Sequence, residues 1–183
     1  AGSCTHEQAR RSFGEMISSP DEVKASVATF AAGCANKLRG QGSAAETVSV
    51  FLCSNSFRKD QPQYFNAESY RFPVATADTI EITEAALKIV DSIYRPGIMY
   101  KKSGVLLGGI VNGGVQRDLF DHIDNREDRL ALSRTIDDVN RKFGLKTVRL
   151  AVEGEKSEVW KVKSEHRSPN YLTDFDELLT IRI

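Results

Sequence analysis

Two segments with helical periodicity constrain this sequence more than any other feature. After Ser19-Pro20-Asp21-Glu22, which is typical of a capping box with proline in the first turn, apolar residues recur every three or four positions. They are Val23, Val27, Phe30, Cys34 and Leu38. A second capping box, from Asp78 to Glu81, precedes Ile82, Ala86, Ile89 and Ile93. We therefore predict one helix that ends near Gly40 and another that ends before Pro96-Gly97.

Strand-like segments flank these two helices. The predicted strands are 10–18, 47–53, 64–72 and 98–107, and the alternation of Val48, Val50 and Leu52 with their neighbours is typical of a half-buried strand. The resulting order β-α-β-β-α-β predicts an α+β fold of the ferredoxin-like kind, a four-stranded sheet with two helices on one face. We place this domain at 10–108 and expect its other sheet face to be open to solvent or to a ligand.

A glycine-rich segment separates this domain from the rest of the chain. Four of the seven residues from Gly108 to Gly114 are glycine, and ordering them costs backbone entropy, so we predict a flexible linker at 109–124. A phosphate-binding loop is the alternative, but the Gly-Lys-Ser/Thr that would follow such a loop is missing.

The remaining residues, 125–183, predict a small α/β appendage. A third helix is expected from about Arg126 to Phe143, with Leu132, Ile136, Val139 and Phe143 on one side. The segments 145–152 and 159–163 are typical of a hairpin. Apolar residues of the tail are candidates to pack back on this unit: Tyr171, Phe175, Leu178 and Leu179.

Charge and cysteine content narrow the functional classes. Lys plus Arg equals Asp plus Glu at 25 each, so nucleic-acid binding would need a local basic patch. Cys4, Cys34 and Cys53 are unclustered, which favours buried, reduced thiols in a cytoplasmic protein. No signal peptide is visible and no apolar run approaches the ~20 residues of a membrane span, so no membrane association is expected.

Catalytic and metal-binding patterns are missing from the sequence. His6, His122 and His166 lie far apart among polar residues, and no Cys/His spacing suits zinc. The pairs Asp137-Asp138 and Asp174-x-Asp176 favour solvated carboxylates over a metal site, since adjacent helical residues point in different directions. We therefore expect no catalytic residue, no metal site and no cofactor in this chain.

Basic residues and small hydroxyl groups recur near the predicted strand ends. Cations and short donors are what binding to a phosphate backbone needs, so this set is the candidate DNA-binding site: Arg11, Ser12, Arg58, Arg71, Lys101, Lys102 and Ser103. An RNA-binding module is one alternative, with bases stacked on Phe51, Tyr64, Phe65 and Tyr70, although the usual RNA-binding sequence signature is missing. A protein-interaction domain is another, and the zero net charge is compatible with it.

The segment after the glycines resembles a docking peptide. Gln116 is followed, after two spacers, by the large apolar residues Leu119 and Phe120. We predict a mobile segment whose Leu and Phe fill an apolar pocket on a partner while Gln116 orients it and Asp118 contributes. The alternative is that Leu119 and Phe120 anchor the linker on the chain's own core.

Several motifs, in this order, resemble the C-terminal half of the UmuC-type catalytic subunits of bacterial DNA polymerase V, which are Y-family, error-prone translesion polymerases. The similarity is carried by these segments: Arg11-Ser12-Phe13-Gly14-Glu15, Tyr100 to Gly108, Gln116 to Phe120, Ser168-Pro169-Asn170-Tyr171 and Asp176-Glu177-Leu178-Leu179. It covers nearly everything from Arg10 onward.

The resemblance implies that 10–108 is a little finger domain, which in this family grips primer–template DNA mostly through its backbone. It also implies that Gln116, Asp118, Leu119 and Phe120 dock on the β sliding clamp. Family clamp motifs often carry Leu where this chain has Arg117, so we expect modest affinity. The region from about Asn125 onward resembles a UmuC-associated segment to which the sequence assigns no role.

The family's catalytic palm, with its magnesium-binding carboxylates, has no match in this chain, so we expect it not to synthesise DNA. The expected role is a non-catalytic part of the SOS response to DNA damage. The expected partners are damaged primer–template DNA and the β clamp, with UmuD′ and RecA as further candidates.

Overall fold

The computed structural model describes residues 6–112, 125–144 and 146–154, and within β1 it describes side chains only for Met16 and Ile17. The elements, in chain order, are β1 (His6–Ile17), α1 (Pro20–Gly40), β2 (Ser43–Ser54), β3 (Phe65–Thr76), α2 (Thr79–Ile93), β4 (Tyr100–Asn112), α3 (Arg126–Phe143) and a 3-10 turn η1 (Ala151–Glu153). The β-α-β-β-α-β order of the first six confirms the predicted α+β class.

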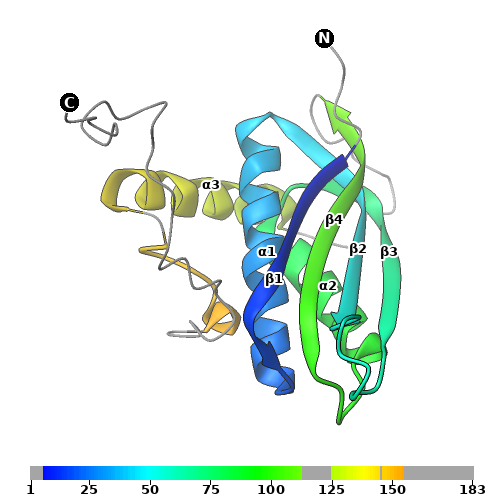
Figure 1. Cartoon of the computed structure of the whole chain (residues 1–183). Helices are drawn as coiled ribbons and strands as arrows, with labels where there is room; N and C mark the ends of the chain where they lie inside the picture. Colours follow the sequence, from blue (N-terminus) through cyan, green and yellow to red (C-terminus); the bar gives the residue numbers. More distant parts are fainter. Residues whose placement is uncertain (1–5, 113–124, 145, 155–183) are drawn as a thin grey trace, which may run out of the picture.

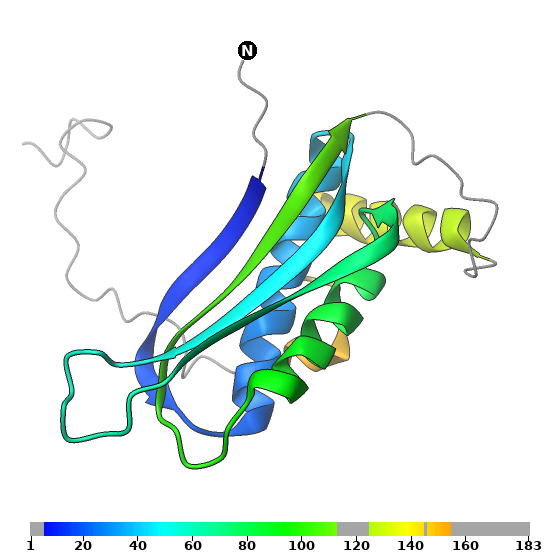
Figure 2. The same ribbon diagram turned by 90° about the vertical axis from the view of Figure 1, so that its right-hand side faces the viewer.

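The four strands form one antiparallel sheet in the order β1-β4-β2-β3. Each β-α-β connection therefore skips a strand: β4 lies between β1 and β2, and β2 lies between β3 and β4. Helices α1 and α2 lie side by side on one face of the sheet (Figures 1 and 2), and α3 stands against them rather than against a strand. Within the described part of the chain, no helix covers the opposite face.

Both predicted apolar stripes are buried between the helices and the sheet. All nine stripe residues, from Val23 to Leu38 in α1 and from Ile82 to Ile93 in α2, belong to the core. The capping predictions fared differently. Asp78 accepts hydrogen bonds from the Ile80 and Glu81 backbone N–H groups, whereas the Ser19 side chain makes no capping bond at the start of α1. Pro20 and the acidic residues Asp21 and Glu22 lie in that first turn.

The flexible linker was predicted to begin too early. Residues Gly108 to Asn112 continue β4 and pair with the first residues of β2. Gly109 has a φ of +62°, and a Cβ there would lie 2.9 Å from the Cβ of Glu46. This glycine therefore fits a positive φ and a close approach to β2, rather than providing flexibility. The rest of the predicted linker lies outside the described residues.

The appendage also differs from its prediction. Helix α3 has the expected bounds, but on its supposed apolar side Leu132 and Phe143 are exposed, at 49% and 67%. The expected strand at 145–152 is a turn followed by η1 in the described residues. The Asn140 side chain bonds both the N–H and the carbonyl of Val148, at 2.8 Å each, and so takes the backbone groups that a strand partner would use.

Thr83→Val should stabilise the chain by about 1 kcal/mol, because a buried hydroxyl without a partner costs free energy. Thr83 is 2% exposed in α2, and among the described residues its hydroxyl has no hydrogen-bond partner. Thr29→Val is the matched control, since the Thr29 hydroxyl donates to the Ala25 carbonyl at 2.9 Å. Urea unfolding of both variants tests this, and equal destabilisation by the two would contradict it.

Candidate nucleic-acid interface

The uncovered face of the sheet is built from the strand residues that alternate with the core. Val48, Val50 and Leu52 of β2 and Val105 and Leu107 of β4 point toward the helices and are fully or almost fully buried. Their neighbours therefore lie on the other face. Register arranges them into four rows across β4, β2 and β3: Lys102–Cys53–Phe65, Gly104–Phe51–Ala67, Leu106–Ser49–Ser69 and Gly108–Thr47–Arg71.

Among the side chains described in β4, β2 and β3, charge on this face lies at its two ends. Lys102 belongs to the first row and Arg71 to the last, and six residues of β4 separate these rows, roughly 20 Å. The rows between them carry Gly104, Phe51 and Ala67, and then Leu106 with the Ser49–Ser69 hydroxyl pair, whose oxygens are 2.8 Å apart. In the described part of β4, β2 and β3, a centre without charged side chains and with cations at both ends suits contact with two sets of phosphates along a nucleic-acid backbone.

Two of the predicted cations already have acidic partners. Arg71 Nη2 lies 3.3 Å from a carboxylate oxygen of Glu46, and both side chains are well exposed. In the β2–β3 loop, Arg58 Nη2 lies 2.6 Å from an Asp60 oxygen. The hydrogen bond between Arg58 and Asp60 raises the pKa of Arg58 and lowers that of Asp60. Both arginines would have to exchange an exposed carboxylate for a phosphate, which costs little at the surface.

A bulge at the start of β4 decides which lysine faces outward. Tyr100 is fully buried, and its hydroxyl accepts a hydrogen bond from the Arg95 N–H at 2.8 Å. Burial raises the pKa of this hydroxyl. In the described sheet, Tyr100 and Lys102 both have register partners in β1 and β2, whereas Lys101 between them has none. The extra residue turns Lys102 to the open face, where it is exposed.

The same bulge removes Ser103 from the candidate DNA-binding set. Ser103 is 0% exposed on the helix side of the sheet, and its hydroxyl lies 3.3 Å from that of Ser26 in α1. Its prediction as a phosphate donor was wrong, because the bulge shifts the alternation by one residue. Arg11 and Ser12 pair in register with Ser103 and Lys102, but their side chains lie outside the described part.

The four aromatic residues of the RNA-binding alternative do not share one face. Phe51 and Phe65 lie on the open face. The Tyr64 hydroxyl donates to the Ile93 carbonyl at the end of α2, and its ring packs on Tyr100. Tyr70 pairs in register with the buried Val48, on the helix side. The quartet is therefore split, and only two rings are available to a ligand on the sheet.

The predicted clamp-binding residues Gln116, Asp118, Leu119 and Phe120 all lie outside the described residues. Among the residues that are described, no three His, Cys, Asp or Glu side chains gather as metal ligands. No helix of that part is long and apolar enough to cross a membrane. Cys34 is buried and Cys53 half-buried, and both are free thiols.

A group of hydrogen bonds and ion pairs, here called the polar seam, holds α3 against α1 and α2. It joins Arg39 to Asp137, Asp78 to Arg129 and Ser133, and Glu81 to Arg126, and the sequence analysis did not predict it. Arg39 of α1 holds Asp137 through two bonds of 2.6 and 2.7 Å, and its remaining nitrogen bonds the Ala77 carbonyl and Thr79 hydroxyl. Burial disfavours the charged form of Asp137, but the hydrogen bonds from Arg39 and Asn36 outweigh it and hold its pKa below the ordinary value. Asp137 is thus not the solvated carboxylate that its position beside Asp138 suggested.

The N-terminal half of α3 is held in the same way at the start of α2. Arg129 Nε lies 3.0 Å from one oxygen of Asp78, and the Ser133 hydroxyl lies 2.9 Å from the other. Arg126 pairs with Glu81 at 2.9 Å, so Glu81 serves this contact instead of closing a capping box. Acidic residues at the N-terminus of α2 thus bind Arg126 and Arg129 and position α3.

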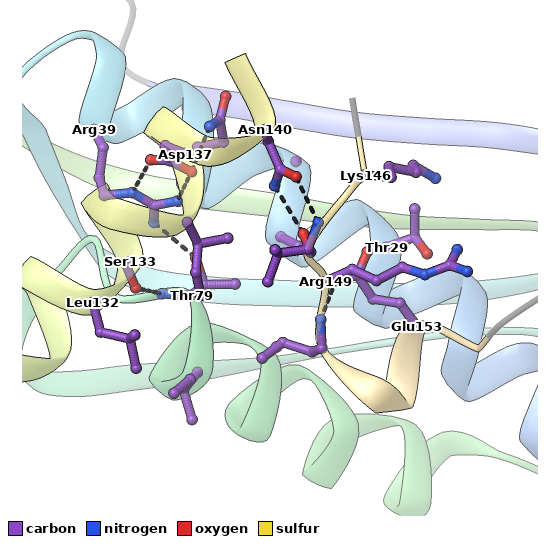
Figure 3. A pocket seen from close by; sticks show the side chains of 17 residues that line it. Thr29, Arg39, Thr79, Leu132, Ser133, Asp137, Asn140, Lys146, Arg149 and Glu153 are labelled. Carbon is purple, nitrogen blue, oxygen red and sulfur yellow. Dashed lines mark hydrogen bonds and ion pairs between the residues drawn. The ribbon is translucent and has the colours of Figure 1, made fainter. Parts of the chain in front are cut away.

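A cavity of about 240 Å³ lies along this seam, between α1, α3 and residues 146–154 (Figure 3). Leu132, Ile136 and Val148 contribute apolar lining. Glu153 lines it as well and accepts a hydrogen bond from the Leu150 N–H, and burial raises its pKa. Arg39 and Asp137, which line the cavity, bind each other. We therefore interpret the cavity as a packing gap between the helices and not as a catalytic site.

Comparison with protein families matches residues 8–119 to the impB/mucB/samB family C-terminal domain. That match covers more than half of the chain and includes α1, α2 and all of the sheet except the first two residues of β1. The chain belongs to this family. Residues 131–181 match a second model, a domain of unknown function, which begins within α3.

Relatives in the impB/mucB/samB family are similar along almost the whole chain. Protein UmuC of Salmonella typhimurium is 35% identical over 173 residues, which is 94% of this chain and 41% of the relative. Protein ImpB of the same species is 33% identical over 174 residues, again 94% of this chain and 41% of the relative. The chain therefore spans about two fifths of the length of these relatives.

Two solved structures have partial similarity to this chain. A complex of the β-clamp processivity factor with the little finger domain of PolIV has a TM-score of 0.43 and 15% identity, covering 64% of this chain and 99% of that one. An insertion ternary complex of Dbh DNA polymerase has a TM-score of 0.47 and 10% identity, covering 59% and 29%.

Proposed function

We propose that this chain is the DNA-gripping and clamp-tethering part of an error-prone translesion DNA polymerase. The observation that carries the proposal is the uncovered sheet face, with a cation at each end of its described rows and uncharged side chains between them, in a chain of the impB/mucB/samB family. The relatives extend well beyond the segment matched here, so polymerisation and its magnesium ions belong to a catalytic unit that we do not place in these residues.

In this proposal the sheet holds duplex DNA by its backbone. Lys102 and Arg71 contact phosphates at opposite ends of the face, and Arg58 adds a contact from the β2–β3 loop. A duplex carries one phosphate per 3.4 Å on each strand, so the roughly 20 Å between the end rows corresponds to about six steps. Such contacts position DNA without reading its sequence, which suits an enzyme that must accept damaged templates.

The second element of the proposal is attachment to the β sliding clamp through Gln116, Asp118, Leu119 and Phe120. These residues precede α3, whose first turns are fixed to α2 by Arg126 and Arg129. We further propose that the chain acts in the SOS response in the cytoplasm, with UmuD′ and RecA as additional partners.

Lys102→Ala combined with Arg71→Ala should weaken DNA binding about equally for all sequences and flatten its salt dependence. Each lost phosphate contact lowers the slope of log affinity against log salt by about 0.9. Fluorescence anisotropy with two unrelated duplexes at several salt concentrations measures both effects. Lys88→Ala is the control, because Lys88 is exposed on α2, on the helix side of the molecule.

Two results would contradict the backbone grip. One is a changed sequence preference with an unchanged salt slope in the double variant. The other is an equal loss of affinity in Lys88→Ala, which would show that overall charge matters and the sheet face does not.

A further inference from the structure

Two aromatic rings stand together at one end of the open sheet face. The rings of Phe51 and Phe65 have centroids 6.4 Å apart and planes inclined by 29°. They come from adjacent rows on β2 and β3, and Phe65 is 69% exposed. Large exposed rings are costly in water, so a persistent pair on a ligand-binding face indicates a contact made when the ligand is present.

The surroundings of this pair are cationic and uncrowded. Lys102 lies in the same row as Phe65, two strands away, and is exposed. On the β4 side, Phe51 faces Gly104, which has no side chain. The β2–β3 loop extends beyond this end of the sheet (Figure 2). It carries Lys59, the Arg58–Asp60 ion pair and Phe57, whose side chain is 89% exposed. Aromatic faces next to cations are the chemistry that binds bases together with their phosphates.

We propose that Phe51 and Phe65 form a stacking platform for an unpaired nucleobase of a single-stranded DNA segment. The inference rests on the proposed DNA grip and deepens it, because it names a second class of DNA contact on the same face. The exposed ring of Phe65 stacks on the base, and Phe51, in the adjacent row, packs against the Phe65 ring. Lys102 binds a phosphate of the DNA strand that carries this base.

The geometry favours an unpaired base over a base pair. Within a duplex each base is stacked on both faces, so a protein ring gains access only at a strand end, a gap or a single-stranded overhang. Every base has a π-face, so a platform of this kind tolerates any sequence. In this arrangement the cations at the ends of the face bind duplex DNA, and the two rings bind an unpaired base. The face would therefore recognise a junction between double-stranded and single-stranded DNA.

Phe65→Leu tests the platform in the whole chain. It keeps apolar bulk and removes the ring, so affinity for a primer–template with a single-stranded overhang should fall about tenfold. Affinity for a blunt duplex of the same length and the salt slope on that duplex should stay unchanged. Phe65→Tyr keeps a ring and should bind the overhang like the original chain. Phe143→Ala is the matched control, since Phe143 is similarly exposed but lies on α3.

The outcomes separate this proposal from the grip. Normal overhang binding by Phe65→Leu overturns the platform and leaves the grip intact. Equal losses on overhang and blunt DNA also overturn it, since the ring then serves the fold or the duplex. If Phe65→Leu alters only self-association in light scattering, the rings bind a second copy and the platform is wrong. If the original chain fails to bind blunt duplex, the grip fails, and a single-stranded oligonucleotide compared across the same variants still decides the platform.

Discussion

Arg39→Met is expected to release α3 from the helix layer at a cost of about 3 kcal/mol in the stability of that contact. The Arg39 side chain is only 6% exposed and Asp137 is 21% exposed, so the pair is largely removed from water. Methionine fills a similar volume but leaves the Asp137 carboxylate without its two strongest bonds, and an uncompensated buried charge is costly. Hydrogen exchange of the α3 amides, 126–143, should report the release directly.

Arg141→Met on the same helix is the matched control. Arg141 pairs with Asp138, but both side chains are more than half exposed. Pairs of this kind contribute between zero and about 1 kcal/mol, so exchange in α3 should hardly change. A second variant, Arg39→Met with Asp137→Leu, should regain much of the protection because it removes the stranded charge. Equal exchange in the two single variants would show that the seam does not hold α3.

The same contact predicts a response to pH. The pKa of Asp137 is lowered in the folded chain, so ionised Asp137 stabilises the folded state at any pH above its unfolded pKa. This stabilisation is lost as the pH falls through the ordinary carboxyl range and then through the lowered folded value. The protection of the α3 amides, taken relative to their intrinsic exchange rates at each pH, should therefore fall in acid, and Arg39→Met should make this acid dependence weaker.

The sheet and its two helices could be predicted because their signals are apolar and periodic. The stripe from Val23 to Leu38 and the one from Ile82 to Ile93 each fix a helix face, and the strands between them leave few alternatives for the topology. Helix α3 has the same kind of periodic signal, but Leu132 and Phe143 on its apolar side are exposed and not buried. Its contacts with α1 and α2 include the polar series Arg126, Arg129, Ser133 and Asp137, spaced by three or four residues, which hydropathy assigns to solvent.

Which side chains face the open side of the sheet depends on shifts of one residue in strand register, and the sequence pattern does not show these shifts. One extra residue at Lys101 sends Ser103 to the core and Lys102 to the open face. Gly109 resembles a linker glycine in the sequence, but its positive φ and its contact with Glu46 belong to a strand. The pairing of Phe51 with Phe65 needed the register between β2 and β3, which no local pattern specifies.

Leu119→Ala with Phe120→Ala should abolish binding to purified β clamp while leaving the fold and DNA affinity intact. Burying a Leu or Phe side chain fully contributes roughly 1.5–3 kcal/mol, so losing both removes most of what a short peptide gains. Ordering the peptide offsets part of that gain, which is why we expect the original affinity to be about micromolar. Surface plasmon resonance with immobilised clamp measures the loss, with circular dichroism and DNA anisotropy as checks on the same samples.

His122→Ala, just beyond the motif, is the control and should bind the clamp like the original chain. Gln116→Ala should weaken binding without abolishing it, because its amide orients the peptide while the apolar pair supplies most of the free energy. If the double variant instead unfolds, and the original chain shows no clamp binding at tens of micromolar, Leu119 and Phe120 are core anchors and the tether must be abandoned. If it stays folded and still binds the clamp, the contact lies elsewhere on the chain, and the sheet-bearing domain becomes the place to search for it.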